Sequence, residues 1–106
     1  MTTTERVRDL NDHARRTFQN CRVVITPGIQ SLDDIAEVLR RVQQFDDFTQ
    51  HNDPYQEHDF GAFHHGDDQV FWKWAYYDVD YTMLSPDPSD PAVTARVLTI
   101  MLADEY

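Results

Sequence analysis

The residues best able to do chemistry stand together between positions 57 and 67, where three histidines are mixed with carboxylates. Imidazole and carboxylate groups bind zinc, manganese and iron, and they also exchange protons in acid–base catalysis. A hairpin in this region would bring His58 near His64 or His65. This cluster therefore supports a metal site, or a small metal-dependent enzyme that uses one of these histidines with a neighbouring carboxylate.

The spacing of the histidines nevertheless matches no established metal signature. There is no HExxH pattern and no cysteine pair, and the adjacent His64 and His65 would point to opposite faces of a strand. We therefore expect histidines that lie at the surface or are hydrogen-bonded, with no cofactor, and keep the metal-dependent enzyme as an alternative. Nucleophilic catalysis has less support, because Cys21 and the serines have no partner pattern around them.

The second candidate for function is the acidity of the chain. Between Gln44 and Val70 there are seven acids and no lysine or arginine. Carboxylates spread over a rigid surface resemble the phosphates of a nucleic acid, so such a surface fits the basic groove of a protein that handles nucleic acid. The predicted contact residues are Asp46, Asp47, Asp53, Glu57, Asp59, Asp67 and Asp68.

The charge is distributed unevenly along the chain. Of the formal net charge of −10, residues 1–43 contribute almost nothing, with seven bases and six acids, whereas residues 44–106 carry two bases and thirteen acids. Direct binding of nucleic acid needs cations that replace phosphate counterions, so this balance argues against it and permits a basic protein partner. A purely solubilising role for the acids is equally compatible with the pattern.

Length and composition predict one domain over residues 1–106. The hydrophobic content of 41% and the charged content of 26% fit a globular chain. No apolar run approaches the ~20 residues of a membrane span, and a single cysteine forms no internal disulfide. We expect a cytoplasmic protein that does not contact a membrane.

Hydrophobic periodicity predicts an α+β fold, in which a small antiparallel sheet packs against three helices. Val7, Leu10, Ala14 and Phe18 form one helical stripe, and Ser31 is a suitable helix cap. The predicted helices span about 4–19, 31–44 and 91–104, and the predicted strands span about 22–26, 60–65, 70–78 and 79–84.

Two parts of this prediction rest on specific residues. Asp90 followed by Pro91 is a strong signal for the start of the last helix, and the apolar residues after it share one stripe. Trp72 and Trp74 fall on one face of the strand 70–78, where core packing accounts for them. A monomer or a dimer fits the sequence, and a dimer formed through Trp72 or Trp74 would make the chain a housekeeping protein-interaction domain.

Several sequence blocks carry a resemblance to a known family. They are Leu10-Asn11-Asp12 with Arg15, ITPGI at 25–29, DPYQEHDFG at 53–61, WKWAYYD at 72–78, SPDPSDP at 85–91 and TARVLTIMLADEY at 94–106. In these blocks the chain resembles a bacterial domain family of unknown function whose members occur on plasmids, on phages and in alphaproteobacterial genomes. It departs from the family pattern at Ala75, where an acid is often found.

The resemblance implies no catalytic residue, but it implies a mobile-element setting. Small acidic proteins of mobile elements often inhibit host defence nucleases. Together with the acidity, this predicts a non-enzymatic, DNA-mimicking inhibitor of the anti-CRISPR or anti-restriction type. Its partner would be the basic surface of a host nucleic-acid-binding protein or nuclease complex.

Overall fold

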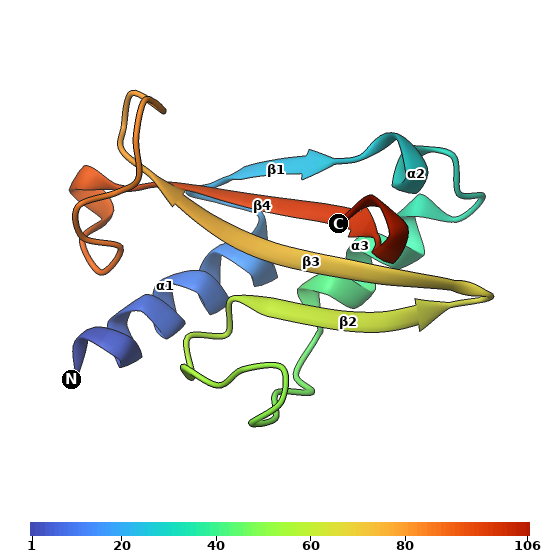
Figure 1. Cartoon of the computed structure of the whole chain (residues 1–106), viewed down its shortest axis with the longest axis horizontal. Coiled ribbons are helices and arrows are strands. Elements are labelled where there is room, and N and C mark those ends of the chain that lie inside the picture. The colour runs from blue at the N-terminus through green and yellow to red at the C-terminus, as the bar shows by residue number, and fades with distance from the viewer.

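A four-stranded sheet in the order β1-β4-β3-β2 organises the chain in the computed structural model, which describes residues 1–106. Figure 1 shows the four strands side by side in this order. β2 and β4 run antiparallel to β3, whereas β1 runs parallel to β4. The predicted α+β class is confirmed, but the sheet is mixed and not purely antiparallel. The strands are β1 (Arg22–Ile25), β2 (Phe60–His65), β3 (Asp68–Tyr77) and β4 (Ala95–Leu102).

The helices α1 (Thr3–Thr17) and α3 (Ile35–Gln43) cover one face of this sheet. Ala14 of α1 and Val42 of α3 belong to the same buried cluster as Trp72 of β3 and Leu98 of β4. Between β1 and α3 lies the short helix α2 (Pro27–Gln30), and two 3₁₀ turns, η1 (Pro91–Val93) and η2 (Ala103–Glu105), flank β4. None of the helices has the length and apolar composition that a bilayer crossing requires.

The first helix is confirmed to within two residues, but the second begins later than predicted. The Thr2 side chain caps α1 by accepting a hydrogen bond from the amide of Glu5. At α3 the cap is Asp34, whose carboxylate accepts from the amide of Glu37 at 3.2 Å. Ser31 donates its hydroxyl to the carbonyl of Gly28 at 2.8 Å and so belongs to the preceding turn.

The strand predicted at 70–78 lies at 68–77, and its inward face is the predicted one. Trp72 is fully buried and Trp74 is only 5% exposed. Because both indoles lie inside the domain, they are not available for a dimer contact. The predicted strands at 22–26 and 60–65 also form, at 22–25 and 60–65.

The helix predicted at 91–104 is wrong, because this segment forms the 3₁₀ turn η1 and the strand β4. The start signal is real but local, since the Asp90 carboxylate accepts from the amide of Ala92 at 2.9 Å and caps one 3₁₀ turn. β4 lies between β1 and β3 and is buried on both faces, so apolar residues fall at every spacing along it. A fully buried strand cannot be told from a buried helix by periodicity, and the β-branched Val97, Thr99 and Ile100 favour the strand.

The strand predicted at 79–84 is also wrong. Residues 78–85 form a loop, here called the apolar loop, whose only β-type pairing with the sheet is one bridge between Tyr77 and Leu84. Asp78 reverses the chain, and its carboxylate accepts from the amide of Thr82 at 2.9 Å. Figure 1 shows this loop in orange, projecting beyond the end of the sheet on the β1 side.

The face of the sheet opposite the helices is covered in part by the chain that follows β4. The Tyr106 ring packs edge-on against Phe60 and Phe71, with centroids 6.5 and 5.8 Å away. The Lys73 ammonium lies 5.2 Å from the centroid of the same ring. An aromatic face, and not an acid, therefore accommodates this base in the sheet.

Candidate functional site

A buried arginine ties the segment after α3 to the first helix. Arg15 of α1 is fully buried, and its guanidinium donates to the carbonyls of Val42 and Phe45 at 3.0 and 2.8 Å. It also donates to Asp12 at 3.0 Å and lies over the Trp72 ring at 4.9 Å. Burial lowers the pKa of Arg15, and the neighbouring Asp12 carboxylate opposes that shift. The guanidinium thus joins α1, α3 and β3 at one point.

Asp12 also holds His58, which precedes β2. The Nδ1 atom of His58 lies 2.9 and 3.0 Å from the two carboxylate oxygens of Asp12. On its other side, Nε2 is 3.6 Å from Oδ2 of Asp53, while Oδ1 of Asp53 accepts from the backbone amide of His58 at 3.0 Å. The ring stacks flat on Phe48 with centroids 3.7 Å apart. Both ring nitrogens therefore face carboxylates of the protein itself, which favours a structural role over acid–base catalysis.

Asn11, one position before Asp12, joins three further segments. Its amide donates to the carbonyl of Glu57 at 3.1 Å and to the hydroxyl of Tyr76 at 2.8 Å. Its oxygen accepts from Nε of Arg96 at 3.0 Å. Arg96 is 4% exposed and also donates to the carbonyl of Pro88. Adjacent residues of α1 thus fix the segment between α3 and β2 and the proline-rich connector before β4.

The environment of this network shifts several pKa values. Burial raises the pKa of Glu57, and the charges of Asp59 and Asp53 raise it further. Burial likewise raises the pKa of Asp59 and of the Tyr76 hydroxyl, and lowers that of the Arg96 guanidinium. In each case the folded protein disfavours the charged form, as desolvation requires.

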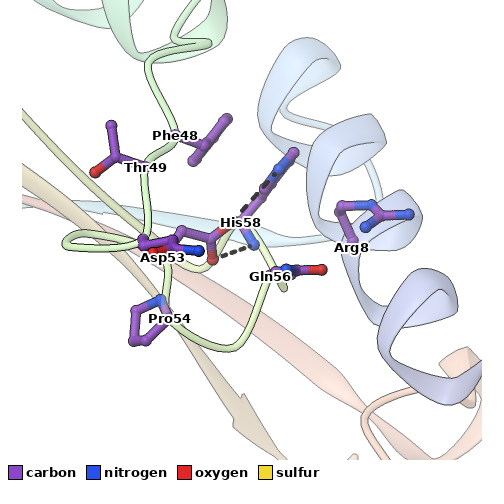
Figure 2. A pocket seen from close by; sticks show the side chains of 8 residues that line it. Arg8, Phe48, Thr49, Asp53, Pro54, Gln56 and His58 are labelled. Atoms are coloured by element: carbon purple, nitrogen blue, oxygen red, sulfur yellow. Dashed lines mark hydrogen bonds and ion pairs between the residues drawn. The ribbon is translucent and has the colours of Figure 1, made fainter.

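An open hollow lies beside His58, between α1 and the segment before β2. Figure 2 shows Arg8 on one side of it, with Asp53, Pro54 and Gln56 on the other. Its volume is about 430 Å³, and Phe48 is its one hydrophobic lining residue. Sites for small molecules are concave and lined mainly by apolar side chains. This polar, shallow hollow does not fit that description.

The three histidines are not brought together. His58 precedes β2, whereas His64 and His65 end that strand, so all three lie on the same arm of the hairpin. Across the turn, His64 pairs with Gln69 and His65 with Asp68. From the start of β2 at Phe60 to His64 the strand alone extends roughly 13 Å, at about 3.3 Å per residue, and His58 lies two residues before that start. The prediction that the hairpin would bring His58 near the other two is wrong, and the structure contains no group of three or more His, Cys, Asp or Glu side chains placed to hold a metal ion.

The seven predicted acidic contact residues fall into three places. Asp46 and Asp47 are exposed after α3, and Asp67 and Asp68 are exposed at the turn between β2 and β3. Asp53 is 5% exposed and is engaged with His58. The other two, Glu57 and Asp59, are half-buried beside the network.

Among the Asp, Glu, Lys and Arg side chains of the segment 44–106, only acids are nevertheless fully exposed. Nine of its thirteen acids are exposed. Neither of its two bases is exposed, because Lys73 is half-buried against Tyr106 and Arg96 is buried on Asn11. Neither base of this part of the chain is therefore fully exposed at its surface. The exposed acids are Asp46, Asp47, Asp67, Asp68, Asp80, Asp87, Asp90, Asp104 and Glu105.

Two features were missed by reasoning from the sequence. The first is the set of hydrogen bonds that join Asn11 and Asp12 to residues 46 to 85 positions away. Nothing in the sequence of α1 indicates which distant residues its polar side chains contact. The second is the exposed apolar cluster of Val79, Met83 and Leu84, which falls in the strand predicted at 79–84. A signal for the loop was present, since the proline-rich SPDPSDP follows it directly.

Comparison with known proteins gives one match. Searches among curated proteins and among solved structures find nothing significantly similar to this chain. A family model described as "Protein of unknown function (DUF3768)" matches residues 25–105, which covers α2, α3, β2, β3, β4 and the apolar loop. Since this match extends over most of the sequence, the chain belongs to the DUF3768 family.

Proposed function

We propose that this protein is a non-enzymatic acidic binding protein of a mobile genetic element such as a phage. It inhibits a host defence complex of the CRISPR or restriction type by occupying a basic groove that otherwise holds nucleic acid. It acts in the cytoplasm and does not itself bind nucleic acid. The observation that supports this proposal best is the surface of residues 44–106, with nine exposed acids and no exposed base.

The physical argument is electrostatic. A groove that binds nucleic acid is lined with lysine and arginine, and a protein surface that presents only carboxylates competes with phosphate for them. Complementary charge accelerates association and makes it sensitive to salt. The mobile-element setting rests on the resemblance of blocks such as DPYQEHDFG at 53–61 to proteins of plasmids and phages.

Within the proposed contact set, the exposed acids contact the partner, whereas the buried Asp53 has a structural role. Asp46, Asp47, Asp67 and Asp68 are free to meet a partner. Asp53 holds His58 and so fixes the backbone between α3 and β2. This segment leads directly from the first exposed pair, so its rigidity limits the entropy that is lost on binding.

The first experiment combines capture with competition. The protein is used to pull down partners from a lysate of the cells that carry its gene, and the recovered complex is then tested for binding of its own DNA. Recovery of a CRISPR or restriction subunit whose DNA is displaced by the protein is the expected result. A partner that binds DNA and this protein at the same time would refute the proposal.

The second experiment changes charge without changing the fold. Replacing Asp46, Asp47, Asp67 and Asp68 with lysine should abolish binding, since all four are exposed and none is part of the buried network. The pair Asp67→Lys and Asp68→Lys is matched by Asp9→Lys and Asp33→Lys, which change the net charge equally on exposed sites outside residues 44–106. If the two double variants lost affinity equally, net charge alone would matter. If the quadruple variant bound as well as the unchanged protein, the acidic surface would be excluded as the contact.

A further inference from the structure

The apolar loop at residues 78–85 exposes an unusual amount of hydrophobic surface. Val79 is 56% exposed, Tyr81 44%, Met83 69% and Leu84 74%. Half of the eight large exposed hydrophobic side chains of the protein therefore lie within six consecutive residues. Isolated exposed apolar residues need no explanation, but a concentrated apolar patch marks a site of interaction.

The loop is held in one shape by its own hydrogen bonds. The Asp78 carboxylate accepts from both the amide and the hydroxyl of Thr82 at 2.9 Å, and the amide of Asp78 donates to the carbonyl of Met83 at 2.9 Å. The amide of Ser85 donates to the carbonyl of Tyr76 at 3.0 Å and closes the base of the loop. A loop fixed in this way presents its apolar side chains at little cost in conformational entropy.

Tyr81 is directed back to the sheet and anchors the loop there. Its ring lies 6.2 Å from that of Tyr77, and the Arg22 guanidinium lies 4.5 Å above it. Tyr81 has a positive φ of 60°, which turns the chain sharply at this point. The outward-directed part of the loop is thus Val79, Met83 and Leu84.

The sequence on both sides of the loop is acidic. From Trp74 to Ala95 there are four acids and no lysine or arginine. Hydrogen bonds to the Asp78 carboxylate, chiefly from the amide of Thr82, lower its pKa. The bases that approach this region are Arg22, over Tyr81, Arg6, whose charge acts on Asp87, and the buried Arg96, which donates to the carbonyl of Pro88. The four acids are Asp78, Asp80, Asp87 and Asp90.

We infer that the apolar loop is a protein-binding anchor, whose Val79, Met83 and Leu84 enter an apolar pocket of a partner protein that is rimmed by lysine and arginine. Charge complementarity between the acids around the loop and that rim identifies this occupant. The inference rests on the proposed binding function. It assigns different roles in binding to two surfaces, the exposed acids and the apolar loop. The exposed carboxylates speed association, whereas the desolvated anchor slows dissociation.

The test of the anchor is a kinetic measurement on the captured partner. Met83→Ser together with Leu84→Ser should weaken binding by ~10- to 100-fold, as the loss of central apolar contacts does, through faster dissociation and with the salt dependence of association unchanged. Tyr55→Ser is the matched control, because Tyr55 is 76% exposed and lies outside the loop. A loss in the double variant no larger than in the control would overturn the anchor while leaving the acidic surface untouched.

A photo-crosslink identifies the occupant independently of affinity. Leu84→benzoylphenylalanine should crosslink to a partner peptide that is apolar and flanked by lysine or arginine, whereas Tyr55→benzoylphenylalanine should not give that product. Crosslinking to a second copy of this chain, to a site without basic residues, or to nothing would overturn the inference. If DNA competition fails but this crosslink forms, the proposed inhibition of a nucleic-acid groove is refuted and the anchor stands.

Discussion

Asp12 of α1 binds the imidazole of His58 through both of its carboxylate oxygens, at 2.9 and 3.0 Å from Nδ1. The same carboxylate accepts a hydrogen bond from the buried guanidinium of Arg15 at 3.0 Å. One acid therefore balances a buried cation and also orients the segment that carries the first exposed acidic pair. The acidic surface depends on a residue that is itself almost hidden.

Replacing Asp12 with alanine should be strongly destabilising. The change leaves Arg15 buried without its acid, and the loss of one partner from a buried charge pair costs roughly 3 kcal/mol of the free energy of unfolding. Urea unfolding measures that loss, and hydrogen exchange should show reduced protection of the amides of Asp53 and His58. Asp9→Ala, an exposed acid on the same helix, should change stability by less than about 0.5 kcal/mol. Similar effects of the two substitutions would show that Asp12 does not balance Arg15.

The carboxyls of Glu57 and Asp59 should make the protein less stable as pH rises. Burial raises both pKa values, so the folded state holds protons that the unfolded state has released. Stability is therefore greatest below the ordinary carboxyl pKa and falls as pH rises from there through the raised folded values. Glu57→Gln and Asp59→Asn should each raise the free energy of unfolding at neutral pH by roughly 0.5 kcal/mol, after allowance for solvent screening.

An acid with the opposite shift provides the control for that experiment. The ion pair and hydrogen bond with Arg40 lower the pKa of Glu37, so its contribution is present above the ordinary carboxyl pKa and is lost as pH falls. Glu37→Gln should therefore reduce stability at neutral pH and not at acid pH. Urea unfolding at neutral and at acid pH distinguishes this loss of stability from the gain expected for Glu57→Gln and Asp59→Asn. A gain in stability at neutral pH from Glu37→Gln would contradict this account.

Gly61 should tolerate no side chain. A Cβ atom at this position would lie 2.3 Å from Nε1 of Trp72, a ring that is fully buried. Gly61→Ala should thus cost up to about 3 kcal/mol through overpacking. Gly66→Ala provides the contrast, because its φ of 61° is strained for alanine but no atom lies within 4 Å, and about 1 kcal/mol is expected. Thermal unfolding compares the two, and an equal loss would show that the indole moves aside.

Cys21 should react slowly with alkylating reagents. The thiol is half-buried and its Sγ lies 3.9 Å from the carbonyl of Ala14, and burial raises its pKa. Since the thiolate is the reactive form, iodoacetamide should modify the folded protein more slowly than the unfolded protein at the same pH. Faster modification of the folded form, followed by mass spectrometry, would point to an activated cysteine.

The elements that the sequence predicts correctly are those with one buried face. In α1 and in β3 the inward positions, such as Val7 and Trp72, recur at a period that belongs to one kind of structure only. This reasoning fails for β4, because both faces of the strand are buried and its apolar residues therefore show no single period. That burial follows from the inner position of β4 in the sheet, which the tertiary fold decides and no local pattern shows. The reasoning fails for the apolar loop too, since Val79 and Tyr81 alternate as in a strand although no neighbouring strand pairs with them.

The candidate site was predictable in composition but not in geometry. The acids at Asp67 and Asp68 lie at a turn, which the neighbouring Gly66 indicates, and they are exposed. Asp53 belongs to the same acidic run in the sequence, yet it is turned inward by His58. His58 is in turn held by Asp12, a partner 46 positions away that no local pattern indicates.

The position of β4 decides when the protein can fold during its synthesis. β1 pairs only with β4, and β3 joins the rest of the sheet through β4 as well. While the first 77 residues leave the ribosome, α1, β1 and the hairpin of β2 and β3 exist without the strand that unites them. A lone hairpin is marginal in water, and contacts between distant parts of a chain form slowly. The sheet can therefore join β1 to the hairpin of β2 and β3 only once the chain has been made as far as Leu102, the last residue of β4.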